Sequence, residues 1–200
     1  MPVTVVQNSE TAGLLAELPP PLRLAVAYAP GSARPAWTAL VLFDHRLARA
    51  VAGASSPLIA QLKLAWWRDR MRESASRWPE SEPLLAALAA FDGERDALEA
   101  LVDGWEGSIG EEADAGALDR LGDARAGAVA ALARTLDCPV NRDAIANLAR
   151  RWTMPDAAQS AAARLPRALR PLLILANLPR PDEAGPLALL RILRHGLFGR

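Results

Sequence analysis

Alanine- and leucine-rich segments, separated at short intervals by proline or glycine, constrain this chain of 200 residues more than any other feature. Alanine and leucine are strong helix formers and β-branched residues are sparse, so the segments between the breaks favour helices over strands. The alternation of polar and apolar residues that is typical of a half-buried sheet is missing. The sequence therefore predicts an all-α protein, a single bundle of about ten helices that forms one domain over residues 1–200.

The breaks also predict where helices begin and end. Pro35, Pro57 and Pro83 each suit the first turn of a helix, where proline is tolerated, and Ser56 before Pro57 is a good N-cap. Residues 104–110 read as a loop between two helices. The expected helices cover residues 11–18, 22–29, 35–51, 57–74, 83–91, 93–102, 111–136, 143–152, 156–165, 167–178 and 186–196.

Charge and cysteine content exclude several classes of protein. The formal net charge is zero, so no overall field draws the chain to nucleic acid. The single Cys138 excludes an internal disulfide and a cluster of thiolate metal ligands. Residues 1–10 lack the pattern of a signal peptide, and apolar runs such as residues 36–43 fall far short of the roughly 20 residues of a membrane span. These features predict a cytoplasmic protein.

Residues 57–71, PLIAQLKLAWWRDRM, predict an unusual helix with two apolar stripes. Such a helix is expected inside a bundle, with neighbours on more than one side. The short connection at residues 53–56 predicts that it packs antiparallel to the preceding helix, with Phe43 near Leu62 or Trp66. The stripes consist of Ile59, Leu62 and Trp66, and of Leu64, Trp67 and Met71.

The two helices around this connection carry motifs. Arg34 precedes the helix expected at residues 35–51, and an apolar run within that helix, residues 39–43, ends in Phe43. The helix expected at residues 57–74 contains the run WWRD. This order of motifs resembles that of the squalene/phytoene synthase family. In that family an arginine precedes a helix of the type alyaF.R..DD..D, and a helix of the type epll..irL.WWrd follows. The resemblance covers residues 18–71 and implies an isoprenoid-synthase-like helical fold in a shortened form. The second helix matches at Pro57, Leu58, Leu64, Trp66, Trp67, Arg68 and Asp69.

The aspartates that such synthases use are replaced. Enzymes of this family neutralise two diphosphates with Mg²⁺, a cation that prefers carboxylate oxygens, held by two aspartate-rich motifs. The first motif falls on residues 48–52, ARAVA, and the stretch expected to carry the second, residues 146–164, contains Asp156 as its single acid. Residues 47–49, LAR, resemble a degenerate branch of the family, the mitochondrial complex I assembly factor and its bacterial relatives.

This resemblance implies a non-catalytic accessory or assembly protein of the respiratory complex I type, with a protein partner and no cofactor. Two alternatives stay open. One is a prenyl-diphosphate transferase that performs phytoene- or squalene-type head-to-head condensation with Mg²⁺. The other is a helical module that binds a prenyl lipid in a retained cavity.

No catalytic residue or metal ligand is assigned from the sequence. The candidate pocket or motif residues are Arg34, Phe43, His45, Trp66, Trp67, Arg68 and Asp69. His45 is either a general base or a polar residue hydrogen-bonded inside the bundle. The two tryptophans either pack in the core or line a lipid pocket. Arg68 and Asp69 either form ion pairs between helices or contribute to a diphosphate site.

Two other regions carry charge patterns. Acids spaced by four residues, which share one helix face, stand at Asp92/Asp96, Glu99/Asp103 and Asp119/Asp123. They are read either as a replacement metal site or as a solvated acidic face. The expected helix within residues 186–200 has an apolar and a basic side. It is expected either to dock on its own bundle, or to make peripheral contact at the inner face of the membrane or bind a partner.

Overall fold

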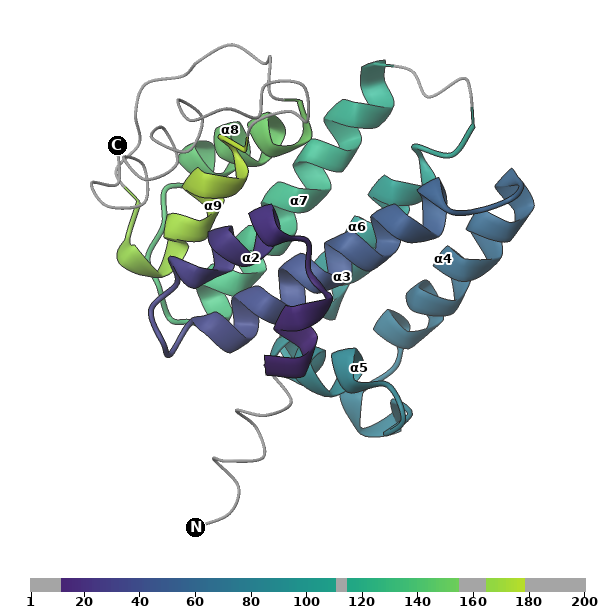
Figure 1. Ribbon diagram of the computed structural model, residues 1–200, viewed down its shortest axis with the longest axis horizontal. Helices are drawn as coiled ribbons and strands as arrows, with labels where there is room; N and C mark the ends of the chain where they lie inside the picture. The colour runs from purple at the N-terminus through teal and green to yellow at the C-terminus, as the bar shows by residue number, and fades with distance from the viewer. Residues whose placement is uncertain (1–11, 111–114, 155–164, 179–200) are drawn as a thin grey trace.

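The computed structural model describes residues 12–110, 115–154 and 165–178 (Figure 1). Within these ranges every regular element is helical, as predicted. A helical segment at residues 12–17 precedes the first labelled helix. The helices are α2 Pro20–Ala27, α3 Arg34–Ala52, α4 Pro57–Arg72, α5 Pro83–Leu88, α6 Arg95–Glu106, α7 Ala115–Thr135, α8 Arg142–Thr153 and α9 Arg170–Leu175. Short 3₁₀ turns occur at Ala75–Arg77, Ala89–Glu94 and Arg167–Leu169.

Proline determines where several of these helices begin. It occupies one of the first two positions of α2, α3, α4, α5 and α9, where its missing N–H has no helical partner to lose. The predicted cap of α4 is present, since the Ser56 side chain accepts a hydrogen bond from the Ile59 backbone N–H. These starts agree with the sequence prediction to within a few residues.

The predicted loop at residues 104–110 is wrong in its first part, because α6 continues to Glu106. Gly104 lies inside this helix at its contact with α7. A Cβ atom at Gly104 would lie 3.0 Å from the Cβ of Ala124, tighter than an ordinary contact, so a side chain there would require α6 and α7 to move slightly apart. Tertiary packing therefore explains a glycine that looked like a helix breaker.

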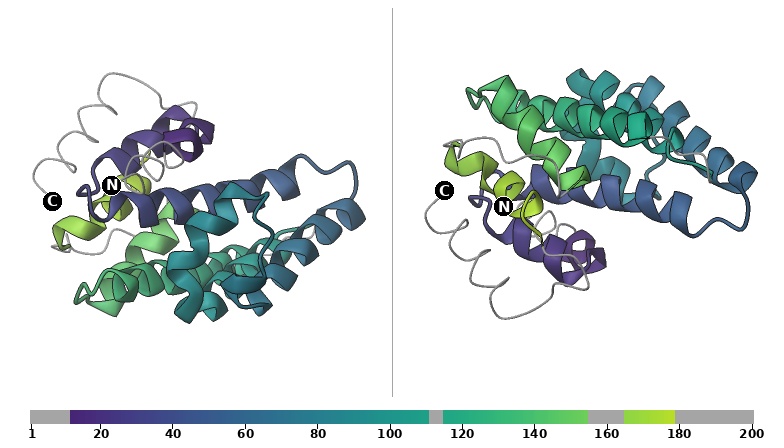
Figure 2. Two further views of the ribbon diagram at one scale, coloured as in Figure 1. Left: turned by 90° about the horizontal axis from the view of Figure 1, so that it is seen from below. Right: turned by 90° about the horizontal axis from the view of Figure 1, so that it is seen from above.

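Helix α3 runs through the middle of the bundle. It lies between α2 on one side and α6 and α7 on the other, and α4 packs along α6 and α3 at the edge of the molecule (Figure 2). Residues 36–44 of α3 are all buried, which makes this helix the centre of the hydrophobic core. Trp37 is buried there and donates its indole N–H to the carbonyl of Ala168, at 2.7 Å, so α3 is also tied to the segment before α9.

Helices α3 and α4 run antiparallel from the short connection at residues 53–56, as predicted (Figure 1). The aromatic partner of Phe43 is different from the one expected. Phe43 packs edge-on against Trp67, with 5.3 Å between ring centroids, and Trp67 in turn contacts Trp66.

The prediction that α4 lies inside the bundle is wrong for one of its two stripes. Leu64, Trp67 and Met71 are buried against α3 and α6. The other stripe, with Leu58 beside it, remains exposed because α4 lies at the edge and its main contacts are on one side. We call these residues the α4 stripe: Leu58, Ile59, Leu62 and Trp66.

Other sequence predictions concern residues outside the described ranges. These are most of the helix expected at residues 156–165 and the whole C-terminal helix of residues 186–196. Among the described helices, none is both long enough and apolar enough to cross a bilayer.

Candidate functional site

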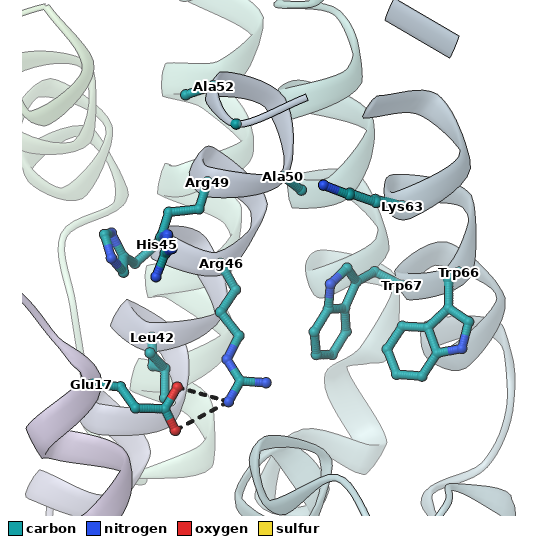
Figure 3. A pocket seen from close by; sticks show the side chains of 11 residues that line it. Glu17, Leu42, His45, Arg46, Arg49, Ala50, Ala52, Lys63, Trp66 and Trp67 are labelled. Atoms are coloured by element: carbon teal, nitrogen blue, oxygen red, sulfur yellow. Dashed lines mark hydrogen bonds and ion pairs between the residues drawn. The ribbon is translucent and has the colours of Figure 1, made fainter. Parts of the chain in front are cut away.

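A pocket of about 750 Å³ opens between α3 and α4, close to the connection that joins them (Figure 3). The α3 residues on its wall lie within three turns of one another, and the α4 residues follow helical i, i+3, i+4 spacing. The segment at residues 12–17 closes one end through Glu17. The lining residues are Glu17, Leu42, His45, Arg46, Arg49, Ala50, Ala52, Gly53, Lys63, Trp66 and Trp67.

The structure brings three of the sequence-predicted residues to this pocket: His45, Trp66 and Trp67. The two indole rings meet edge-on, with centroids 4.7 Å apart. Trp67 is 7% exposed and Trp66 is 41% exposed, so one ring belongs to the core and the other stands at the surface. Adjacent helix positions point about 100° apart, which explains why neighbouring tryptophans serve different surroundings.

The other candidates lie elsewhere. Arg34 begins α3 and donates to the carbonyl of Ala29 at 3.2 Å, so it ties the preceding turn to the helix. Phe43 is fully buried behind Trp67. Asp69 is exposed on α4 and does not line the pocket.

Arg68 forms ion pairs between helices, one of the two roles considered for it. Its Nε donates to Asp103 at 2.7 Å, and its Nη2 pairs with Glu106. Both acids belong to α6, so Arg68 fastens α4 to that helix. The guanidinium is turned toward α6 and away from the pocket between α3 and α4.

The pocket wall is basic. Four of its side chains carry titratable or fixed positive charge: His45, Arg46 and Arg49 from α3, and Lys63 from α4. Arg46 is neutralised, because it binds Glu17 at 2.8 Å (Figure 3). It also binds Glu82 at 2.7 Å. Burial lowers the pKa of His45, and the nearby positive charge of Arg49 lowers it further, against a smaller opposite effect from Asp44. His45 is therefore mostly neutral at pH 7.

The pocket does not fit Mg²⁺. Three of the residues at the positions of the first aspartate motif, Arg49, Ala50 and Ala52, line the wall and supply no carboxylate. Glu17 is the acid among the lining residues, and both of its oxygens accept from Arg46. Mg²⁺ requires oxygen ligands and one or more free carboxylates. Throughout the described residues, no group of three His, Cys, Asp or Glu side chains could hold a metal ion.

Four of the six acids with four-residue spacing, at least one from each pair, form ion pairs with arginines. Asp103 pairs with Arg68, as described above. Each of the following acids likewise lies against an arginine: Asp92 against Arg95, Glu99 against Arg72, and Asp123 against Arg150. Carboxylates that are each matched by a guanidinium on the surface act as ion pairs and do not form a shared cation site.

A buried polar centre lies on another side of α3, and sequence reasoning missed it. Asp44 accepts from Arg125 of α7 through two hydrogen bonds of 3.0 and 2.9 Å, and both side chains are buried. Trp105 of α6 donates to the same carboxylate at 2.9 Å. The Arg125 guanidinium carbon lies 4.4 Å from the ring centroid of Trp152 and 5.1 Å from that of Trp105. This centre joins four helices, α3, α6, α7 and α8.

The sequence held one signal for this centre. Asp44 follows directly on the apolar run of residues 36–43, and an acid on such a helix requires a partner. The partner could not be named, because Arg125 lies 81 residues away and belongs to a helix with several other charged residues.

Comparison with known proteins extends the resemblance beyond the two motif helices. No curated protein and no solved structure matches the chain. The family model for squalene/phytoene synthase matches residues 22–180. This range contains α3, α4 and the helices that surround them, and it covers most of the chain. The all-helical bundle agrees with the fold of that family, and the chain belongs to the squalene/phytoene synthase family.

Proposed function

We propose that this protein is a non-catalytic member of the family, an accessory or assembly protein of the respiratory complex I type that acts by binding another protein. One observation carries the proposal. The α3 positions where a synthase has its first aspartates are Arg49, Ala50 and Ala52, on a pocket wall that is basic.

The chemistry of the family explains why this matters. Head-to-head condensation begins with loss of a diphosphate, and Mg²⁺ has to neutralise the negative charge that develops on it. A basic wall can bind an anion, but it cannot hold a divalent cation beside that anion. A condensing enzyme built on this chain lacks the usual apparatus on the α3 side of the pocket.

The α4 stripe supports the second half of the proposal, contact with a protein. Leu58 and Leu62 are 63% and 59% exposed, which is high for large apolar side chains on a structured helix. Together with Ile59 and Trp66 they form a continuous apolar strip on adjacent helical turns. Contiguous exposed apolar surface of this kind is typical of protein–protein contact sites, where tryptophan is often an energetic anchor.

The proposal that the protein is non-catalytic is tested with purified protein, Mg²⁺ and either farnesyl or geranylgeranyl diphosphate. We expect no condensation product above a blank without protein. Product that forms and disappears on addition of a chelator would overturn the non-catalytic assignment.

The proposed role in complex I assembly through the α4 stripe is tested in cells of the source organism that lack the gene. We expect reduced assembled complex I on native gels, restored by the wild-type gene but not by a variant with Leu58→Asp and Leu62→Asp. Leu118→Asp is the matched control, because Leu118 is another exposed leucine but lies on α7, outside the stripe. Normal complex I in the deletion strain, or full rescue by the stripe variant, would contradict the proposal.

A further inference from the structure

The α4 stripe faces solvent on the side of α4 opposite to its packed side. Successive helical residues turn by about 100°, so the four stripe residues share one side of the helix. The other side is buried in the bundle and carries Ala60, Leu64, Trp67 and Met71. Leu58 and Leu62 expose more than half of their surface, so apolar area remains there for a partner to cover.

The two edges of the stripe carry different charge. On the edge toward α3, Lys63 is exposed and forms no ion pair with any residue in the described part of the chain (Figure 3). On the edge toward α6, Gln61 is uncharged, and Arg68 is neutralised by Asp103 and Glu106. A surface that covers the stripe therefore meets an unmatched positive charge on its α3 side.

The stripe ends in charged residues after Trp66. Asp69 is exposed, and it lies one helical turn further along the same side of α4. Arg70 is already paired, since Glu73 binds it at 3.1 Å and its guanidinium lies 5.9 Å from the ring centroid of Trp66. The apolar surface thus spans residues 58–66, about 12 Å along the helix at about 1.5 Å per residue.

A second copy of the chain fits this pattern poorly. In an antiparallel pair of α4 helices with a two-fold axis at Leu62, both Lys63 side chains lie on the same edge, about 3 Å apart along the helix direction. In a parallel two-fold pair, each Asp69 faces the Asp69 of the other copy. Both arrangements oppose like charges, whereas a different protein can supply the opposite charge.

We propose that the α4 stripe binds an amphipathic helix of the partner protein, whose apolar side covers the stripe and whose border carries acids that pair with Lys63. A straight apolar strip on one helix suits a second helix, because anchors spaced by three or four residues then meet it along its length. This inference rests on the proposed function, contact with another protein through the α4 stripe, and adds the chemistry of the partner.

Fluorescence anisotropy with labelled synthetic helices of about 18 residues, or five turns, tests the proposal. The peptides share one leucine face, and its borders carry glutamates in one peptide and lysines in the other. We expect the glutamate peptide to bind saturably, one per chain, and about fivefold or more tighter than the lysine peptide at low salt. The difference should shrink in about 0.5 M NaCl, which screens surface charges.

Variants connect this preference to the stripe. Lys63→Glu should reverse it, so that the lysine peptide binds more tightly. Arg142→Glu is the matched control, since Arg142 is exposed, lies on α8 and forms no ion pair among the described residues. Leu58→Asp with Leu62→Asp should weaken both peptides by about tenfold or more. All four substituted residues are exposed, so the variants are expected to fold, and circular dichroism verifies this.

Several results would overturn the inference. They are absence of peptide binding, equal affinity for the two peptides, and an unchanged preference in Lys63→Glu. Self-association of the free protein through the stripe, or stripe-dependent binding to anionic lipid vesicles in place of peptide binding, would also overturn it.

The deletion strain separates this inference from the proposed function. Lys63→Glu should restore less complex I than Arg142→Glu does. Full rescue by Lys63→Glu, together with failure of the Leu58/Leu62 variant, would leave the proposed function standing and refute the acidic helix. Normal complex I in the deletion strain would contradict the proposed function, and the peptide preference then decides the inference on its own.

Discussion

The buried pair of Asp44 and Arg125 offers the sharpest test of how this bundle is held together. Asp44 is 4% exposed and Arg125 is 7% exposed, so neither charge can be solvated if the other is removed. In Arg125→Met the carboxylate keeps one of its described donors, the indole N–H of Trp105. Breaking a buried pair by removal of one partner costs about 3–5 kcal/mol, and we expect a loss of that size in the free energy of unfolding.

The double variant Asp44→Leu with Arg125→Met should be less damaged than the sum of its parts. It removes both charges and leaves the N–H of Trp105 without its acceptor, which costs about 1–3 kcal/mol. Thr153, which accepts from Arg125, still donates to the carbonyl of Ala149. The two substitutions should therefore be strongly coupled, and the double variant should be more stable than Arg125→Met alone.

Urea unfolding followed by circular dichroism measures these free energies in a double-mutant cycle. The control is Arg134→Met, which breaks the pair of Arg134 with Glu94 at the surface and should cost less than about 1 kcal/mol. A cost for Arg125→Met no larger than that of the control would refute the reasoning. So would a double variant whose loss equals the sum of the single losses.

Two further predictions concern the pocket. Trp67→Ala should cost about 3–5 kcal/mol of unfolding free energy and Trp66→Ala clearly less, because the first ring is buried against Phe43 and the second is 41% exposed; equal losses in urea melts would contradict this. The lowered pKa of His45 means that the unfolded chain binds a proton more readily than the folded one. Stability should therefore fall as the pH drops below about 6.5, the ordinary value for histidine, and His45→Gln should reduce this part of the slope in urea midpoints measured between about pH 8 and pH 5.

The fold class and most helix limits were predictable because they depend on local chemistry. Pro57 with its Ser56 cap begins α4 for reasons contained in a few adjacent residues. Gly104 shows the limit of such reasoning. Its role depends on Ala124 in a different helix, and no local rule distinguishes a glycine that ends a helix from one that lets two helices touch.

The position of α4 shows a second limit. The periodicity of apolar residues predicts both stripes of α4, but it does not indicate which stripe packs against other helices. Burial of Leu64 and exposure of Leu62 follow from the placement of α4 at the edge beside α3 and α6. That placement is a property of the whole bundle.

The pocket was predicted in part. The WWRD motif indicates Trp66 and Trp67, and a titratable residue on an otherwise apolar helix indicates His45. Arg49 replaces an aspartate of the family motif in the sequence, but its place on a pocket wall depends on the packing of α4 along α3. Charges on separate helices define a site only after the helices are packed.

The positive charge of the pocket wall follows from the positions and partners of the acids around α3. Asp44 is directly next to His45 in the sequence, but adjacent positions point about 100° apart, so its carboxylate faces Arg125 in the core. Glu17 and Glu82, the acids that reach α3 from outside, both bind Arg46. Glu17, the acid among the lining residues, is thus matched by Arg46, and Arg49 follows one helical turn further along α3. The same pairing that stabilises the bundle therefore leaves the pocket wall with positive charge and without a free carboxylate for a metal ion.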